Sequence, residues 1–165
     1  MRLRLITMAC LAAALSMTAC NKTEQATDPV AAADYVKAGQ DFLAKTAKEP
    51  GVVTLPSGLM YKVLSSPNPS APKPAVTDKV KVHYEGKLVD GKVFDSSYER
   101  GTPAVFKVNQ VVEGWQIGIP LMHKGDTYML YVPSNLGYGE IARGEDIPAN
   151  SVLVFKVELL DIQGK

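Results

Sequence analysis

The chain has 165 residues, 46% of them hydrophobic, and a formal net charge of +1. This length and composition suit one domain with a true hydrophobic core plus a short extension. The near-zero charge and the lack of lysine or arginine runs argue against nucleic-acid binding. The two histidines are far apart in the sequence and the only cysteines are Cys10 and Cys20, so we expect no metal site and no cofactor.

Residues 1–19 are typical of a signal peptide. A basic start precedes a mostly apolar run from Leu5 to Ala19, which is too short to span a bilayer comfortably. The run ends in Leu15-Ser-Met-Thr-Ala-Cys20, which resembles the lipobox of bacterial lipoproteins, where the signal is cut before the cysteine and the thiol is lipidated. The alternative is an ordinary secretory signal followed by an incidental cysteine. We expect lipidation, because a lone cysteine in an oxidising compartment needs an explanation.

Residues 20–50 are expected to form a lipidated tether followed by a helix. Asn21 stands where lipoproteins retained in the inner membrane commonly have aspartate, so the lipobox resemblance implies an outer-membrane anchor on the periplasmic side. The pattern becomes helical from 31 to 48, with a partial apolar stripe that contains Tyr35, Phe42 and Leu43. We predict that this helix is solvated or packed on itself.

The first strand of the folded domain is predicted from the alternation of Leu59, Tyr61 and Val63. Several prolines follow between residues 65 and 74, and they predict an exposed loop without ladder hydrogen bonds. After the hairpin described next, the alternation of Ala104, Phe106 and Val108 predicts a further strand.

A β-hairpin is predicted over residues 80–97. Apolar and polar residues alternate in its first arm, which indicates a strand with one buried face, and the apolar residues are Val80, Val82 and Tyr84. Gly86 is expected to interrupt this arm. Asp90-Gly91 is the strongest short sequence signal for a hairpin turn.

The hairpin brings an acid and two aromatic rings together. Phe94 and Asp95 lie on the return arm and are expected to face the same space as Tyr84. A carboxylate among rings is costly unless its hydrogen bonds are met. This cluster is therefore either a well-paired structural acid or a functional site.

The elements predict an α+β fold in which a curved, mostly antiparallel β-sheet of five to six strands wraps around one short helix, with an N-terminal helical extension. The helix is predicted over Gln110–Met122, where one apolar face contains Val112, Trp115, Ile119 and Met122. It is the only internal segment able to cover the sheet. The two last strands are centred on Leu130 and Val157, and the long loop between them, 133–150, is expected to be functional.

The domain, residues 51–165, resembles the FKBP-type peptidyl-prolyl isomerases. The resemblance covers roughly residues 52–162, and its segments come in the family's order. These segments are V-H-Y-E-G at 82–86, D-G-K-V-F-D-S-S at 90–97, V-V-E-G-W at 111–115, G-Y-G at 137–139, I-P at 147–148 and L-V-F-K-V-E-L-L at 153–160. The resemblance implies the same fold as the residue patterns predict.

The resemblance also implies a proline pocket whose floor is Trp115, although from composition alone this residue reads as plain core. The other residues that it assigns to the catalytic pocket are Tyr84, Phe94, Asp95, Tyr138 and Phe155. Those expected to bind substrate are Arg100, Val111, Val112 and Ile147, the last through its backbone N–H. We expect Asp95 to orient groups and stabilise charge rather than act as a base. His83 is predicted to lie outside the site, because alternation turns it away from Tyr84.

The function implied by the resemblance is peptidyl-prolyl cis-trans isomerisation, which would assist the folding of envelope proteins. The implied partners are proline-containing polypeptides, macrolide inhibitors of the tacrolimus and rapamycin type, and the membrane through its lipid anchor. A proline-peptide-binding chaperone or adaptor with little turnover is the alternative. The helix and the segment G-V-V-T-L-P-S-G-L at 51–59 resemble the macrophage infectivity potentiator group. Those relatives dimerise through a longer N-terminal region, most of which is absent here, so we expect a monomer.

Overall fold

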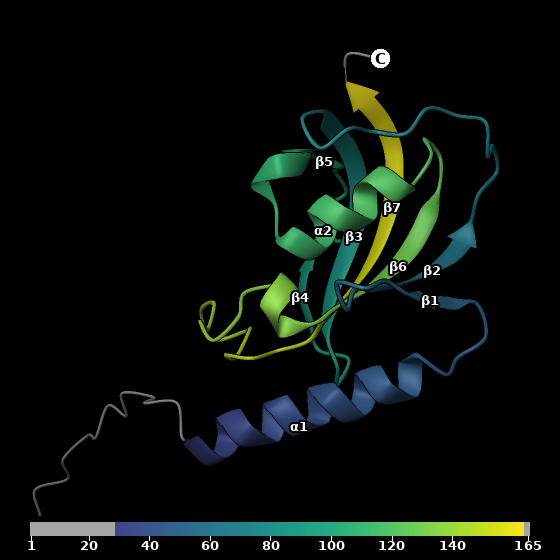
Figure 1. The fold of residues 1–165 in the computed structure, drawn as a ribbon. Coiled ribbons are helices and arrows are strands. Elements are labelled where there is room, and N and C mark those ends of the chain that lie inside the picture. The colour runs from purple at the N-terminus through teal and green to yellow at the C-terminus, as the bar shows by residue number, and fades with distance from the viewer. Residues whose placement is uncertain (1–28, 164–165) are drawn as a thin grey trace, which may run out of the picture.

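A single antiparallel sheet curves around one short helix, and a second helix lies below it in the view of Figure 1. The computed structural model describes residues 29–163, so the predicted signal peptide and Cys20 lie outside the described residues. The strands are β1 (Val52–Thr54), β2 (Met60–Ser65), β3 (Lys79–Leu88), β4 (Val93–Ser96), β5 (Ala104–Lys107), β6 (Thr127–Val132) and β7 (Leu153–Gln163). They lie in the order β1-β2-β6-β7-β3-β4, with β5 also paired to β3.

The α+β prediction is confirmed, with a 7-stranded sheet where the sequence predicts five to six strands. The additional strand is β1, which pairs with β2 at the edge of the sheet and is too short to show an alternating pattern. The predicted interruption at Gly86 is wrong, because β3 continues to Leu88. The alternation of apolar and polar residues cannot be followed through this position, because glycine has no side chain to mark it as apolar or polar.

The helix that covers the concave face is α2 (Glu113–Gly118), which is shorter than predicted. Two turns of 3-10 helix flank it, η1 (Val108–Gln110) and η2 (Ile119–Leu121), so Val108 belongs to η1 rather than to the predicted strand. Close packing explains one glycine of this helix, since a Cβ on Gly114 would lie 2.6 Å from Cγ1 of Val132 on β6. This close approach holds Trp115 against the sheet.

The N-terminal helix, α1 (Pro29–Thr46), packs against the other face of the sheet. Phe42 and Leu43 contact a small cluster formed by Met60, Tyr131 and Val154. The Phe42 and Tyr131 rings lie 6.1 Å apart between centroids. The prediction of a solvated or self-packed helix is therefore wrong. Alternation assigns one face of β2, β6 and β7 to solvent, but this face carries large apolar residues where α1 lies on it.

Within residues 29–163, no helix combines the length and the apolarity needed to cross a membrane.

Candidate active site

A cavity of about 290 Å³ opens between the concave face of the sheet and α2. The chain reaches it from both arms of the hairpin, from β5, η1, α2 and β7, and from the loop after β6. Its walls are Tyr84, Phe94, Asp95, Phe106, Gln110, Val111, Val112, Trp115, Tyr138 and Phe155. All six residues predicted as catalytic line this one space, as do Val111 and Val112. Arg100 and Ile147 are not among its lining residues.

Trp115 forms one side of an aromatic box. Trp115 is 3% exposed, and three rings stand nearly perpendicular to its indole. Tyr84 lies 5.3 Å away between centroids at 86°, Phe155 5.2 Å away at 81°, and Phe106 5.8 Å away at 84°. Edge-to-face pairs of this kind are favourable beyond the area they bury, so they fix the four rings against one another.

The indole N–H is a buried donor with no acceptor within residues 29–163. A buried polar group without a partner costs about 1–3 kcal/mol, so native structures rarely leave one unsatisfied. Trp115 is therefore more than ordinary core, since it combines this unsatisfied donor with a place in the cavity wall.

The absence of a side chain on Gly86 provides the space in which the Phe94 and Phe155 rings contact each other. These two rings form an edge-to-face pair with centroids 5.6 Å apart. A Cβ on Gly86 would lie 2.5 Å from Cζ of Phe94 and 2.9 Å from Cε1 of Phe155. The missing side chain in the middle of β3 is thus what allows both rings to reach the cavity.

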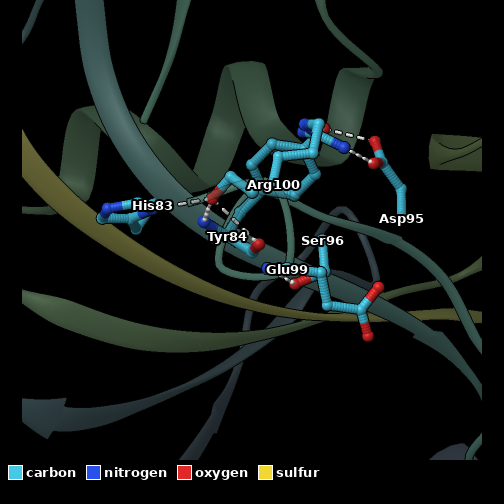
Figure 2. Close-up of polar contacts among 7 residues, drawn as sticks. His83, Tyr84, Asp95, Ser96, Glu99 and Arg100 are labelled. Atoms are coloured by element: carbon cyan, nitrogen blue, oxygen red, sulfur yellow. Dashed lines mark hydrogen bonds and ion pairs between the residues drawn. The ribbon is translucent and has the colours of Figure 1, made fainter. Parts of the chain in front are cut away.

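A polar triangle stands at the edge of the cavity and joins Asp95, Tyr84 and Arg100 (Figure 2). The Tyr84 hydroxyl donates to Oδ2 of Asp95, and Nη1 of Arg100 donates to Oδ1 of the same carboxylate. Nη2 of Arg100 also donates to the Tyr84 hydroxyl, at 3.0 Å. Every member bonds to both others, so the acid is both a well-paired group and part of the cavity wall.

The triangle fixes the charge state of its members at neutral pH. Burial by itself would raise the pKa of Asp95, but the hydrogen bonds from Tyr84 and Arg100 and the guanidinium charge outweigh it and leave that pKa below its usual value. Burial, followed by the hydrogen bond to Asp95, raises the pKa of Tyr84. Asp95 is therefore a carboxylate and Tyr84 a neutral phenol near pH 7, which suits charge stabilisation and not proton transfer.

Arg100 and Ile147 contribute differently from the way the sequence predicts. Arg100 acts on the cavity only through Asp95 and Tyr84. Ile147 is 7% exposed, and its N–H donates to the Arg143 carbonyl at 3.3 Å inside the loop after β6. This amide is thus already engaged. The N–H of Val112, which lines the cavity, donates no hydrogen bond within the described part of the chain.

Two lining residues escape the sequence analysis. Phe106 has the pattern of an ordinary buried strand residue. Its ring lies 5.8 Å from the Tyr84 ring between centroids, and this contact depends on strand pairing that the sequence does not reveal. Gln110 is an exposed polar residue in η1, and nothing in its surroundings in the sequence marks it.

Comparison with known proteins shows to which family the domain belongs. Residues 70–160 match the model of the FKBP-type peptidyl-prolyl cis-trans isomerases. The chain belongs to this family. A second model, for the domain amino-terminal to FKBP-type peptidyl-prolyl isomerases, matches residues 6–63.

Several curated members of the FKBP family are similar to this chain. It is 49% identical over 132 residues to the FKBP-type peptidyl-prolyl cis-trans isomerase FkpA of Aeromonas hydrophila, covering 80% of this chain and 48% of the relative. It is 42% identical over 125 residues to the outer membrane protein MIP of Legionella longbeachae, covering 76% of this chain and 53% of the relative. The chain thus spans about half the length of these relatives.

Solved FKBP structures share the architecture. The crystal structure of FkpA from Escherichia coli matches with a TM-score of 0.77 at 42% identity, over 81% of this chain and 62% of that one. A peptidyl-prolyl cis-trans isomerase from Pseudomonas syringae matches with a TM-score of 0.72 at 33% identity, over 79% of this chain and 94% of that one. The FKBP fold in this chain is therefore supported by sequence and by structure.

Proposed function

We propose that this chain is a peptidyl-prolyl cis-trans isomerase that acts on proline-containing polypeptides of the bacterial envelope. The observation that carries the proposal is the open cavity in which three rings stand perpendicular to the Trp115 indole beside an ionised, fully paired Asp95. A cavity of about 290 Å³ is large enough for a prolyl ring and its amide. Family membership supports the same activity.

Isomerisation needs no reactive group, which agrees with the protonation states at the site. The barrier to rotation of a peptide bond is about 18–20 kcal/mol, because resonance stiffens the C–N bond. The same resonance places negative charge on the carbonyl oxygen, and water stabilises it. Rings that exclude water remove this stabilisation from the planar amide and favour the twisted, less polar transition state. Each 1.36 kcal/mol gained in this way is about tenfold in rate.

Hydrogen bonds then have to hold the flanking chain while the amide turns. We assign the backbone donor to the N–H of Val112, because Val112 lines the cavity and its N–H has no acceptor among residues 29–163. Tyr138 supplies a second polar group to the same cavity from the loop after β6. The Asp95 carboxylate, held by Tyr84 and Arg100, supplies the fixed charge.

The decisive experiment measures isomerisation by the full-length chain in mild detergent. A proteolysis-coupled assay on an X-Pro peptide is expected to show catalysis, and a macrolide of the tacrolimus type is expected to inhibit it. The macrolide is also expected to change the fluorescence of Trp115, the single tryptophan of the chain. Saturable peptide binding without rate enhancement would instead support a proline-binding chaperone or adaptor.

We further propose that residues 1–19 are removed as a signal peptide and that Cys20 carries a lipid anchor on the periplasmic side of the outer membrane. The name of the Legionella longbeachae relative, an outer membrane protein, supports an envelope location. Cys20→Ser is expected to move the protein from the membrane pellet to the soluble periplasmic fraction, with isomerase activity per molecule unchanged. A variant that still pellets with the membrane after a high-salt wash would contradict the anchor.

We propose that the chain is a monomer, because Phe42 and Leu43 of α1 are already covered by the chain's own sheet. A dimeric mass for the Cys20→Ser protein in light scattering would contradict this proposal.

A further inference from the structure

Ser97 holds the backbone of Tyr84 at both of its polar groups. It lies one residue beyond the end of β4 and is fully buried. Its hydroxyl accepts a hydrogen bond from the Tyr84 N–H at 2.7 Å and donates to the Tyr84 carbonyl at 3.2 Å. Its own N–H donates to the same carbonyl at 2.9 Å. A buried N–H needs such a partner, so the hydroxyl is a structural requirement of this strand position.

The position of Ser97 in the chain links it to the polar triangle. Asp95 lies two residues before it and Arg100 three residues after it, and both bond to the hydroxyl of Tyr84. The Thr102 N–H donates to the Ser97 carbonyl at 3.3 Å and closes the turn that carries Arg100. Ser97 therefore determines where Asp95 and Arg100 lie relative to the Tyr84 ring.

A histidine on the other face of the sheet contacts the same hydroxyl. Nδ1 of His83 lies 2.9 Å from Oγ of Ser97, and Figure 2 shows His83 and Asp95 on opposite sides of Tyr84. The His83 ring stacks on Tyr98 with centroids 4.7 Å apart and an interplanar angle of 15°. The Tyr98 hydroxyl in turn donates to Glu158 on β7 at 3.1 Å. The imidazole is thus held in place.

The single hydrogen of a serine hydroxyl can serve only one acceptor at a time. When Nδ1 of His83 carries a proton, it donates to Ser97, and the hydroxyl hydrogen is free to bond to the Tyr84 carbonyl. When Nδ1 is bare, it competes with that carbonyl for the hydrogen. The histidine therefore influences which bond Ser97 makes to Tyr84.

We propose that Ser97 is a positioning residue of the isomerase site and that His83 orients its hydroxyl from the opposite face of the sheet. The inference rests on the proposed function. Neither residue lines the cavity, so both act through the placement of Tyr84 against Asp95 and Arg100.

Ser96 provides a matched control in the same turn. It is also buried, but its hydroxyl accepts from the Glu99 N–H at 3.3 Å and makes no hydrogen bond to Tyr84. In the full-length chain in mild detergent, Ser97→Ala is expected to lower kcat about tenfold with KM within about twofold, because a small misplacement costs rate while the apolar walls still bind substrate. Ser96→Ala is expected to keep both constants within about twofold, because the contacts of Tyr84 are retained. Both constants can be measured by NMR exchange on an X-Pro peptide.

A double-mutant cycle separates positioning from general structural damage. If Ser97 acts through the Tyr84 hydroxyl, Ser97→Ala in a Tyr84→Phe background lowers kcat by less than about twofold further. Ser97→Thr, which keeps the hydroxyl, is expected to restore most of the rate. A Ser97→Ala chain as active as Ser96→Ala, or a full tenfold loss that persists without the Tyr84 hydroxyl, would overturn the proposal.

His83→Phe supplies an independent variant should Ser97→Ala fail to fold. It preserves the stack on Tyr98, removes Nδ1, and is expected to lower kcat about threefold, since one of the three side-chain contacts of Ser97 is lost. An unchanged kcat would overturn the role of His83. An inactive wild-type chain would contradict the proposed function alone. The same variants are then compared by macrolide affinity through Trp115 fluorescence, where Ser97→Ala should bind within about twofold of Ser96→Ala, because the apolar walls are retained.

Discussion

Replacing Trp115 with leucine is expected to lower kcat/KM by at least about 100-fold, which corresponds to about 2.7 kcal/mol of transition-state stabilisation. The indole is the shared partner of Tyr84, Phe106 and Phe155, so its loss removes three edge-to-face contacts at once. The walls can then relax into the space, and water enters where the amide should be dry. The proteolysis-coupled assay measures the rate, and urea denaturation measures the accompanying loss of stability, expected at about 2–4 kcal/mol.

Met122→Leu is the control for this change. Met122 is fully buried at the end of η2 but does not line the cavity. A swap that conserves volume usually costs less than about 1.5 kcal/mol, so this variant should fold and keep its activity. A folded Trp115→Leu chain with the activity of Met122→Leu would contradict the role of the indole as the floor of the site.

The sequence predicts the site better than it predicts the surroundings of the site. The hairpin over 80–97 could be predicted because an alternating arm and an Asp-Gly turn are local signals, and they bring Tyr84, Phe94 and Asp95 together as expected. Only the family's motifs assign Trp115 to a cavity, because a buried core tryptophan and a pocket tryptophan look alike in a single sequence. Phe106 cannot be assigned to the cavity from the sequence for the same reason, since it has the pattern of an ordinary strand residue.

Features that depend on tertiary contacts, or on how an irregular loop folds, could not be predicted. The docking of α1 depends on Tyr131 and Val154, which lie on strands far along the chain. The engagement of the Ile147 N–H depends on a fold of its own loop, where Arg143 supplies the acceptor. Gly86 is the clearest case, because a glycine read locally as a break is in fact the residue that the aromatic rings require.

Gly86→Val is therefore expected to have the second large effect, a fall in kcat/KM of about 10- to 100-fold with a stability loss of about 1–3 kcal/mol, as overpacked sites show. A Cβ alone would lie 2.5 Å from Cζ of Phe94 and 2.9 Å from Cε1 of Phe155, so both rings must leave their edge-to-face arrangement. Valine suits a strand, so the backbone of β3 should remain paired with β7. The assay on the X-Pro peptide and macrolide binding measure the loss.

A second substitution tests whether steric overlap with the rings causes the losses expected for Gly86→Val. Phe94→Leu removes about as many atoms as the valine adds, so Gly86→Val combined with Phe94→Leu is expected to regain stability relative to Gly86→Val alone. It is also expected to regain part of the macrolide affinity, because Phe155 can return to the Trp115 indole, 5.2 Å away between centroids. If both variants were equally impaired, the cause would lie in the backbone of β3 and not in the rings. Recovery would mean that the absent side chain of Gly86 shapes the cavity as directly as the rings themselves.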